Sequence, residues 1–164
     1  MSEAPAGTRV TLLGIGNVEA RDDGVGVEVA RRLERAARDL GVDVVLGGMA
    51  GMGLIRHFME SDFLVVVDAI DAGAEPGAIF RFDPDEAGVT QLRSNNIHNM
   101  GLPYLVTNAR LLGADPRVVV YAVQVGDVGP GDDLTPPVVA AVSEVERMVA
   151  EELREILGES AERV

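Results

Sequence analysis

The chain has 164 residues with no cysteine and no tryptophan, and its 27 acidic residues outnumber 14 basic ones, for a formal net charge of −13. A chain of this length buries about 70 % of its unfolded surface and can form a full core, while the lack of cysteine excludes disulfides, thiolate nucleophiles, zinc fingers and iron–sulfur ligation. The negative field disfavours nucleic acid as a partner and suits a basic protein segment or a metal cation.

Hydrophobic spacing predicts strands and helices that alternate along the chain. Apolar residues recur every three or four positions from Val25 to Leu40, which indicates a helix that Gly41 ends. The nearly continuous apolar run 63–67 is typical of a central strand covered on both faces. In chain order we expect a strand at 10–13, a helix at 24–40, a strand at 42–46, a short helix at 54–59, strands at 63–67 and 78–82, a helix at 101–112, a strand at 118–123, and a last helix from the cap residue Thr135 to 157.

This alternation predicts an α/β fold, a single three-layer α/β/α sandwich with a mostly parallel sheet of about five strands. We expect one domain over residues 1–164, with flexible ends at 1–8 and 158–164. The start of the chain has no apolar core of a signal peptide, and no run approaches the roughly 20 apolar residues that cross a bilayer. We therefore expect a cytoplasmic protein without a membrane partner.

The segment 14–26 connects the first strand to the first helix through a glycine-lined loop. Gly14 and Gly16 fit the start of a dinucleotide-binding G-x-G-x-x-G motif, but the third glycine position holds Glu19. A pyrophosphate would also face the nearby carboxylates of Asp22 and Asp23. The glycines are better explained by tight-turn geometry than by nucleotide binding.

Two carboxylates and one imidazole are the candidate functional residues. Asp23 follows the first strand, Asp68 closes the apolar run 63–67, and His98 lies in a polar segment before a helix. Open α/β sheets bind ligands beyond the carboxyl ends of their strands, so the three side chains can meet at that edge. Together they suit a divalent ion such as nickel, iron, manganese or zinc. A structural alternative stays open, in which Asp22 or Asp23 caps the first helix and Asp68 only accepts backbone hydrogen bonds.

Nucleophilic catalysis has little support in the sequence. There is no G-x-S-x-G turn, no cysteine and no H-E-x-x-H motif, and neither His57 nor His98 has an obvious serine partner. With only two histidines, a three-histidine zinc site is excluded.

Four segments in order resemble the hydrogenase maturation proteases, the endopeptidases that trim the C-terminal tail from the large subunit of nickel–iron hydrogenases. They are the Gly-Ile-Gly-Asn turn with the acidic pair before Gly-Val-Gly (14–26), the strand end Val-Val-Val-Asp-Ala (65–69), the His-Asn-Met-Gly-Leu segment (98–102), and the loop before the last helix (123–138). The chain departs from the family pattern where some members carry Glu in place of Asp23 and where others often have Gln in place of Asn99.

The resemblance implies a peptidase whose catalytic and metal-binding residues are Asp23, Asp68 and His98. Its partner would be the large-subunit precursor, which brings the nickel, and no organic cofactor would be needed. The amide could be attacked by nickel-assisted water, which we favour, or with an aspartate as general base, as in an aspartyl protease. Two other classes stay open: a nickel-sensing or chaperone-like protein that binds the precursor without cutting it, and a flavodoxin-like cofactor binder, which six aromatic residues would serve poorly.

Overall fold

The computed structural model describes residues 5–84 and 97–158. Its strands are β1 (Val10–Ile15), β2 (Asp43–Gly48), β3 (Phe63–Ile70), β4 (Ile79–Phe82) and β5 (Arg117–Gln124). Its helices are the 3₁₀ turns η1 (Arg21–Gly24) and η2 (Gly51–Leu54) and the α-helices α1 (Val25–Asp39), α2 (Ile55–Glu60), α3 (Ile97–Leu111) and α4 (Pro136–Ile156).

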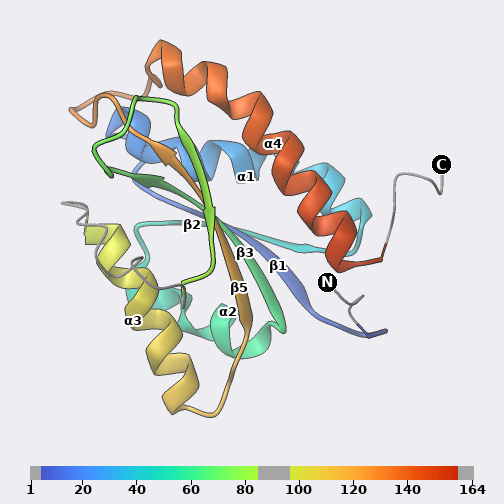
Figure 1. The fold of residues 1–164 in the computed structure, drawn as a ribbon. Helices are drawn as coiled ribbons and strands as arrows, with labels where there is room; N and C mark the ends of the chain where they lie inside the picture. The colour runs from blue at the N-terminus through green and yellow to red at the C-terminus, as the bar shows by residue number, and fades with distance from the viewer. Residues whose placement is uncertain (1–4, 85–96, 159–164) are drawn as a thin grey trace.

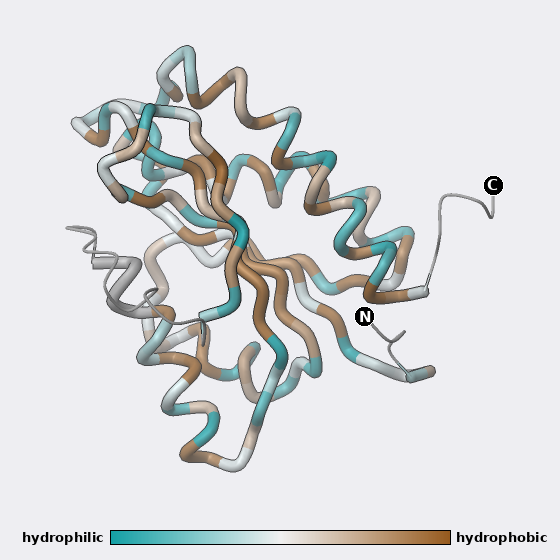
Figure 2. Tube along the Cα trace, viewed as in Figure 1, coloured by the Kyte–Doolittle hydropathy of each residue, from teal (hydrophilic) through white to brown (hydrophobic). Residues whose placement is uncertain are grey.

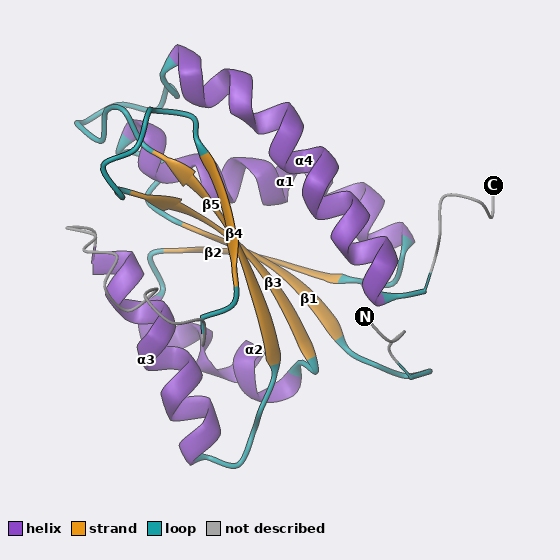
Figure 3. Ribbon diagram, in the orientation of Figure 1, coloured by secondary structure: helices purple, strands orange, loops and turns teal. Residues whose placement is uncertain are grey.

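The five strands form one sheet in the order β2-β1-β3-β5-β4 (Figure 3). The β1–β2, β1–β3 and β3–β5 pairs are parallel, and β4 runs antiparallel to β5 at the edge. The apolar run at 63–67 thus lies in the central strand, as its continuous hydrophobicity predicts.

Helices cover both faces of the sheet, which confirms the predicted three-layer sandwich (Figure 1). Along β3, Val65 and Val67 pack in the core beneath α1 and α4, whereas Leu64 and Val66 pack in the core with α2 and α3. This alternation follows the two-residue period of a strand, and both cores meet at the hydrophobic strands in the middle of the molecule (Figure 2). In the described ranges, no helix is long and apolar enough to cross a membrane.

β1 and β3 each extend beyond the carboxyl end that their sequence pattern predicts. β1 continues through Gly14 to Ile15, and β3 continues through Asp68 to Ile70. Asp68 therefore lies inside the strand, opposite Ala122 of β5, and does not close it as predicted. Ladder pairing with a neighbouring strand outweighs the low strand propensity of glycine and aspartate.

The third α-helix begins earlier than predicted. α3 starts at Ile97, so the backbone of His98 belongs to the first turn of the helix and not to a loop before it. Pro103 lies in the helix interior, where its ring removes one backbone donor. The predicted start near 101 was wrong. It placed Pro103 in the first helical turn, where proline is most common, but the helix already begins at Ile97.

Candidate active site

Close backbone packing brings η1 and the start of α1 to the carboxyl ends of β1 and β3. A Cβ atom at Gly26 would collide with the carbonyl oxygens of Val67 and Ile15, so only glycine lets α1 begin this close to the sheet. Gly16 has φ +135°, and a Cβ there would collide with the carbonyl oxygen of Asp23. These glycines therefore serve tight packing around the acidic pair, in agreement with the turn-geometry interpretation.

Asp23 is buried beside this turn, with 4 % of its surface exposed. Its Oδ2 accepts a hydrogen bond from the backbone N–H of Asn17 at 3.0 Å. The N-cap position of α1 is Gly24, so Asp23 does not occupy the cap position that the structural alternative gave it. The Asn17 bond instead fixes the Asp23 carboxylate against the glycine-lined loop.

Asp68 is 2 % exposed, and one of its two carboxylate oxygens has a hydrogen-bond partner in the described part of the chain. Its Oδ1 accepts a hydrogen bond from the backbone N–H of Ala69 at 2.8 Å. Its buried Oδ2 has no hydrogen-bond partner within residues 5–84 and 97–158. An unsatisfied buried carboxylate oxygen is costly unless a proton or a cation reaches it.

The pKa of Asp68 lies well above its ordinary value of 3.8. Burial is the main cause, the hydrogen bond from Ala69 opposes it, and the negative charge of Asp23 raises the pKa further. This coupling indicates that the two carboxylates lie near each other. A cation between them would remove the desolvation cost and the mutual repulsion at once.

The orientation of Asp68 points toward the helix that carries His98. Along β3, Asp68 lies on the same face of the sheet as Leu64 and Val66, because side chains alternate between the two faces. Leu64 and Val66 pack in the core with α2 and α3. The side chain of His98 lies outside the described part of the chain, and the described residues contain no cluster of three metal-ligating side chains. The structure thus brings Asp23 and Asp68 together and leaves the predicted role of His98 as a prediction.

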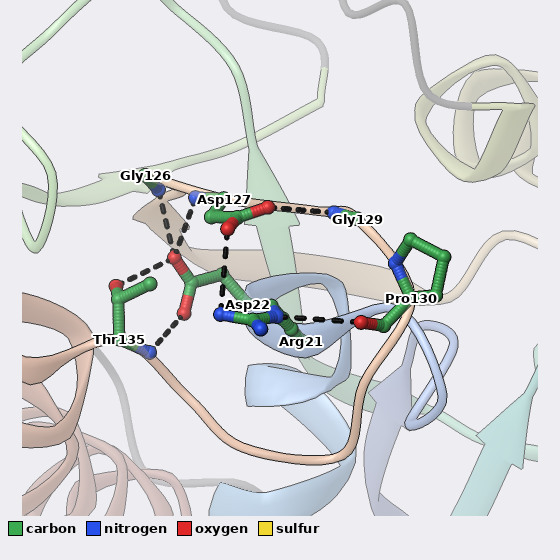
Figure 4. A network of polar contacts seen from close by, with 7 residues as sticks. All are labelled: Arg21, Asp22, Gly126, Asp127, Gly129, Pro130 and Thr135. Carbon is green, nitrogen blue, oxygen red and sulfur yellow. Dashed lines mark hydrogen bonds and ion pairs between the residues drawn. The ribbon is translucent and has the colours of Figure 1, made fainter.

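Asp22 is fully buried and faces the loop between β5 and α4 (Figure 4). Its Oδ2 accepts bonds from the backbone N–H groups of Gly126 and Asp127, at 2.8 and 3.0 Å, and from the hydroxyl of Thr135 at 2.7 Å. Its Oδ1 accepts a bond from the Thr135 N–H at 2.7 Å. Burial alone would raise the pKa of Asp22, but these donors hold it below its ordinary value. Asp22 is therefore no helix cap, and sequence patterns gave no signal for its distant partners.

Gln124 is a second buried polar residue that sequence reasoning missed. It ends β5 next to Ile70 of β3, and its Oε1 accepts bonds from the N–H groups of Ala72 at 2.8 Å and Ala74 at 3.3 Å. Its Nε2 donates to Asp71 Oδ1 at 3.1 Å. Gln124 thereby holds the loop after β3 at the same edge of the sheet. The available signal was a polar residue directly after an apolar strand.

The fold and these residues define a class of α/β protein with a carboxylate-based site beyond the carboxyl ends of its strands. The family model described as "Hydrogenase maturation protease" matches residues 27–152, a span that includes Asp68 and His98 and begins just after Asp23. The chain belongs to the hydrogenase maturation protease family and is a peptidase.

Named relatives agree with this assignment. The hydrogenase expression/formation protein HupD of Bradyrhizobium diazoefficiens is 36 % identical over 135 residues, which cover 79 % of this chain and 70 % of that protein. The hydrogenase 2 maturation protease of Escherichia coli is 31 % identical over 152 residues, 90 % of this chain and 92 % of that protein. The solved structure of the E. coli hydrogenase maturating endopeptidase HybD superposes with a TM-score of 0.80 at 27 % identity, over 90 % of this chain and 93 % of that one.

Proposed function

We propose that this peptidase removes the C-terminal extension of a nickel–iron hydrogenase large-subunit precursor after nickel insertion, and that Asp23, Asp68 and His98 recognise the nickel. One observation carries the proposal: Asp68 Oδ2 is buried without a hydrogen-bond partner in the described part of the chain, next to the charge of Asp23. Such a pair favours a cation over any neutral or anionic ligand. Family membership supports the choice of substrate.

The metal arrives with the precursor in this proposal. Two carboxylates and one imidazole form an incomplete ligand set, which suits a borderline ion such as nickel only when further ligands are added. The large subunit supplies those ligands together with the metal. The protease then binds productively only when nickel is present. A nickel-free precursor lacks the metal contact that aligns its tail for cleavage.

The two aspartates take part in the chemistry in different ways. Asp23 is held by the Asn17 amide, whereas burial raises the pKa of Asp68 so that it tends to keep a proton in the empty site. Metal binding requires the ionised carboxylate and releases that proton. The nickel would polarise a water molecule, and a carboxylate of the pair would accept a proton from this water as its oxygen adds to the scissile carbonyl. The same carboxylate would return that proton to the amine as the C–N bond breaks.

Mass spectrometry of a cognate precursor tests the proposal. Wild type should release a defined C-terminal peptide from the nickel-loaded precursor and leave the nickel-free precursor intact. Asp23→Asn should release none, because the neutral amide removes one charge from the pair. Asp43→Asn, a matched change at an exposed carboxylate at the start of β2, should cleave like wild type.

Each alternative result has a distinct meaning. Cleavage of the nickel-free precursor would remove nickel recognition from the proposal, and cleavage by Asp23→Asn would remove that carboxylate. Binding of the loaded precursor without any peptide release would show a docking protein in place of a protease. His98→Ala tests the third residue: it should abolish release while the far-ultraviolet circular dichroism stays that of wild type, and a variant that retains full cleavage would contradict the role of His98.

A further inference from the structure

We propose that Asp22 is a positioning residue, which anchors the turn η1 to the β5–α4 loop and thereby orients the Asp23 carboxylate for the reaction. This inference rests on the proposed function for its catalytic consequence. The observation behind it is the juxtaposition of two consecutive buried aspartates whose carboxylates bind different segments of the chain. Asp22 binds Gly126, Asp127 and Thr135, whereas Asp23 accepts a hydrogen bond from Asn17.

The anchor consists of several contacts between segments more than 100 residues apart in the sequence. Besides the four bonds to its carboxylate, the Asp22 N–H donates to the Asp127 carbonyl at 3.1 Å. The Arg21 N–H donates to the Gly131 carbonyl at 2.9 Å, and the Gly131 N–H donates to the Glu19 carbonyl at 2.9 Å. Figure 4 shows Asp22 at the centre of this network, with Arg21 reaching Pro130 and Asp127 on its outer side. The loop and η1 are thus joined on both sides of Asp22.

A four-residue 3₁₀ turn has little stability of its own, so outside contacts decide where its residues lie. Successive side chains of such a turn point about 120° apart, because it has three residues per turn. Anchoring Asp22 in one direction therefore sets the direction of Asp23, whose Oδ2 accepts the Asn17 N–H. A shift of the turn would move Asp23 relative to Asp68 on the rigid strand β3.

Thr135 gives independent support for a dedicated anchor. It occupies the N-cap position of α4, where a threonine hydroxyl usually accepts a bond from the first helical N–H groups. Here no side-chain cap bond forms, and the hydroxyl donates to Asp22 Oδ2 instead. Thr135 therefore binds Asp22 beside the candidate site and does not cap its own helix.

Amide hydrogen exchange at Asn17 measures the orientation of Asp23 without any substrate, because that N–H donates to Asp23 Oδ2. Asp22→Asn places an NH₂ group against at least one of the N–H donors that now point at the carboxylate. We expect exchange at the Asn17 amide to accelerate at least about tenfold, the factor that one charge-assisted hydrogen bond contributes. Thr135→Val should act in the same direction with a smaller effect, and Thr135→Ser should restore the wild-type rate because it keeps the hydroxyl.

Glu152→Gln is the matched control for a loss of buried carboxylate bonds. Glu152 is buried and accepts bonds from Arg81 at 2.9 and 3.0 Å and from Tyr121 at 2.6 Å, in a network that includes neither Asp22 nor Asp23. We expect this variant to lose stability but to keep the Asn17 exchange rate and kcat of its folded fraction. Asp22→Asn should instead lower kcat for the nickel-loaded precursor by about 10- to 100-fold, as changes behind a metal ligand do, with KM nearly unchanged.

The outcomes separate this proposal from the proposed function. Faster Asn17 exchange with a lower kcat in Asp22→Asn and Thr135→Val, and rescue by Thr135→Ser, would support the positioning role. Wild-type exchange at Asn17 in Asp22→Asn would overturn it, as would a kcat loss no larger than that of Glu152→Gln at equal stability. If wild type cleaves no precursor, the proposed function fails, while the exchange rates still decide whether Asp22 orients Asp23. If Asp22→Asn does not fold, the Thr135→Val and Thr135→Ser pair decides alone.

Discussion

Replacing Asp68 by asparagine should stabilise the protein at neutral pH. The substitution keeps an acceptor for the Ala69 N–H and removes a carboxyl group whose ionised form burial and Asp23 both disfavour. A buried charged group without a partner costs about 2 kcal/mol or more. For a chain of 164 residues, a gain of about 2 kcal/mol raises Tm by roughly 4 to 8 °C. The variant should at the same time lose peptide release, so that stability and activity change in opposite directions.

The gain should depend on pH with a defined sign. Unfolded Asp68 titrates near 3.8, and its folded pKa lies well above that value. Between these two pKa values the folded state binds more protons than the unfolded state, so this group lowers stability as pH rises. Urea unfolding of wild type and Asp68→Asn, followed by circular dichroism, should therefore show nearly equal stability near about pH 4 and a widening difference toward about pH 7.

Two results would refute this reasoning. An Asp68→Asn variant less stable than wild type at neutral pH would mean that the carboxylate is satisfied in the folded protein. A stability difference that does not change with pH would mean that the effect comes from packing and not from ionisation. Asp43→Asn, at an exposed position, controls for the loss of one negative charge and should change the free energy of unfolding by less than about 0.5 kcal/mol.

Three further changes test other parts of the structure. Gly26→Ala should lower the free energy of unfolding by about 3 kcal/mol, because the new Cβ meets the backbone of β3; chemical denaturation measures it, and a neutral result would show that α1 can move. Tyr121→Phe should cost about 2 kcal/mol through the lost hydroxyl bond to Glu152 at 2.6 Å, whereas unchanged urea midpoints would contradict that value. The lowered pKa of Asp22 contributes stability above about pH 4, and this stability is lost as pH falls. The free energy of unfolding of Asp22→Asn should therefore fall less steeply with decreasing pH than that of wild type. An equally steep fall would argue against a hydrogen-bonded carboxylate at this position.

Sequence patterns predicted the layers of the fold well because they depend on local periodicity. The continuous apolar run at 63–67 indicated a central strand, and helical spacing from Val25 onward located α1 within one residue at each end. Element ends were less accurate where pairing with a neighbouring strand decides them. The continuation of β3 past Asp68 depends on the ladder to β5, which no local pattern reveals.

The sequence predicted which residues form the candidate site better than it predicted their hydrogen-bond partners. Asp23 and Asp68 were expected at one edge of the sheet, and the pKa coupling between them agrees with that expectation. The partners of Asp22 were not predictable, because Gly126 and Thr135 lie more than 100 residues away. An acidic residue before a helix locally resembles a cap, and only the folded chain shows that its carboxylate binds another loop.

The place of Asp68 inside β3 has a consequence for how a substrate must approach. Because its backbone continues two residues further in the ladder with β5, opposite Ala122, the carboxylate is mounted on one of the least mobile parts of the molecule. If Asp68 ligates a metal ion as proposed, it would not follow the incoming ion, which would have to arrive at the position that the strand dictates. Adjustment during docking then falls to the incoming precursor. The protease would then accept a precursor whose metal ion lies at the position fixed by Asp68, and it would not accept a precursor whose metal ion lies elsewhere.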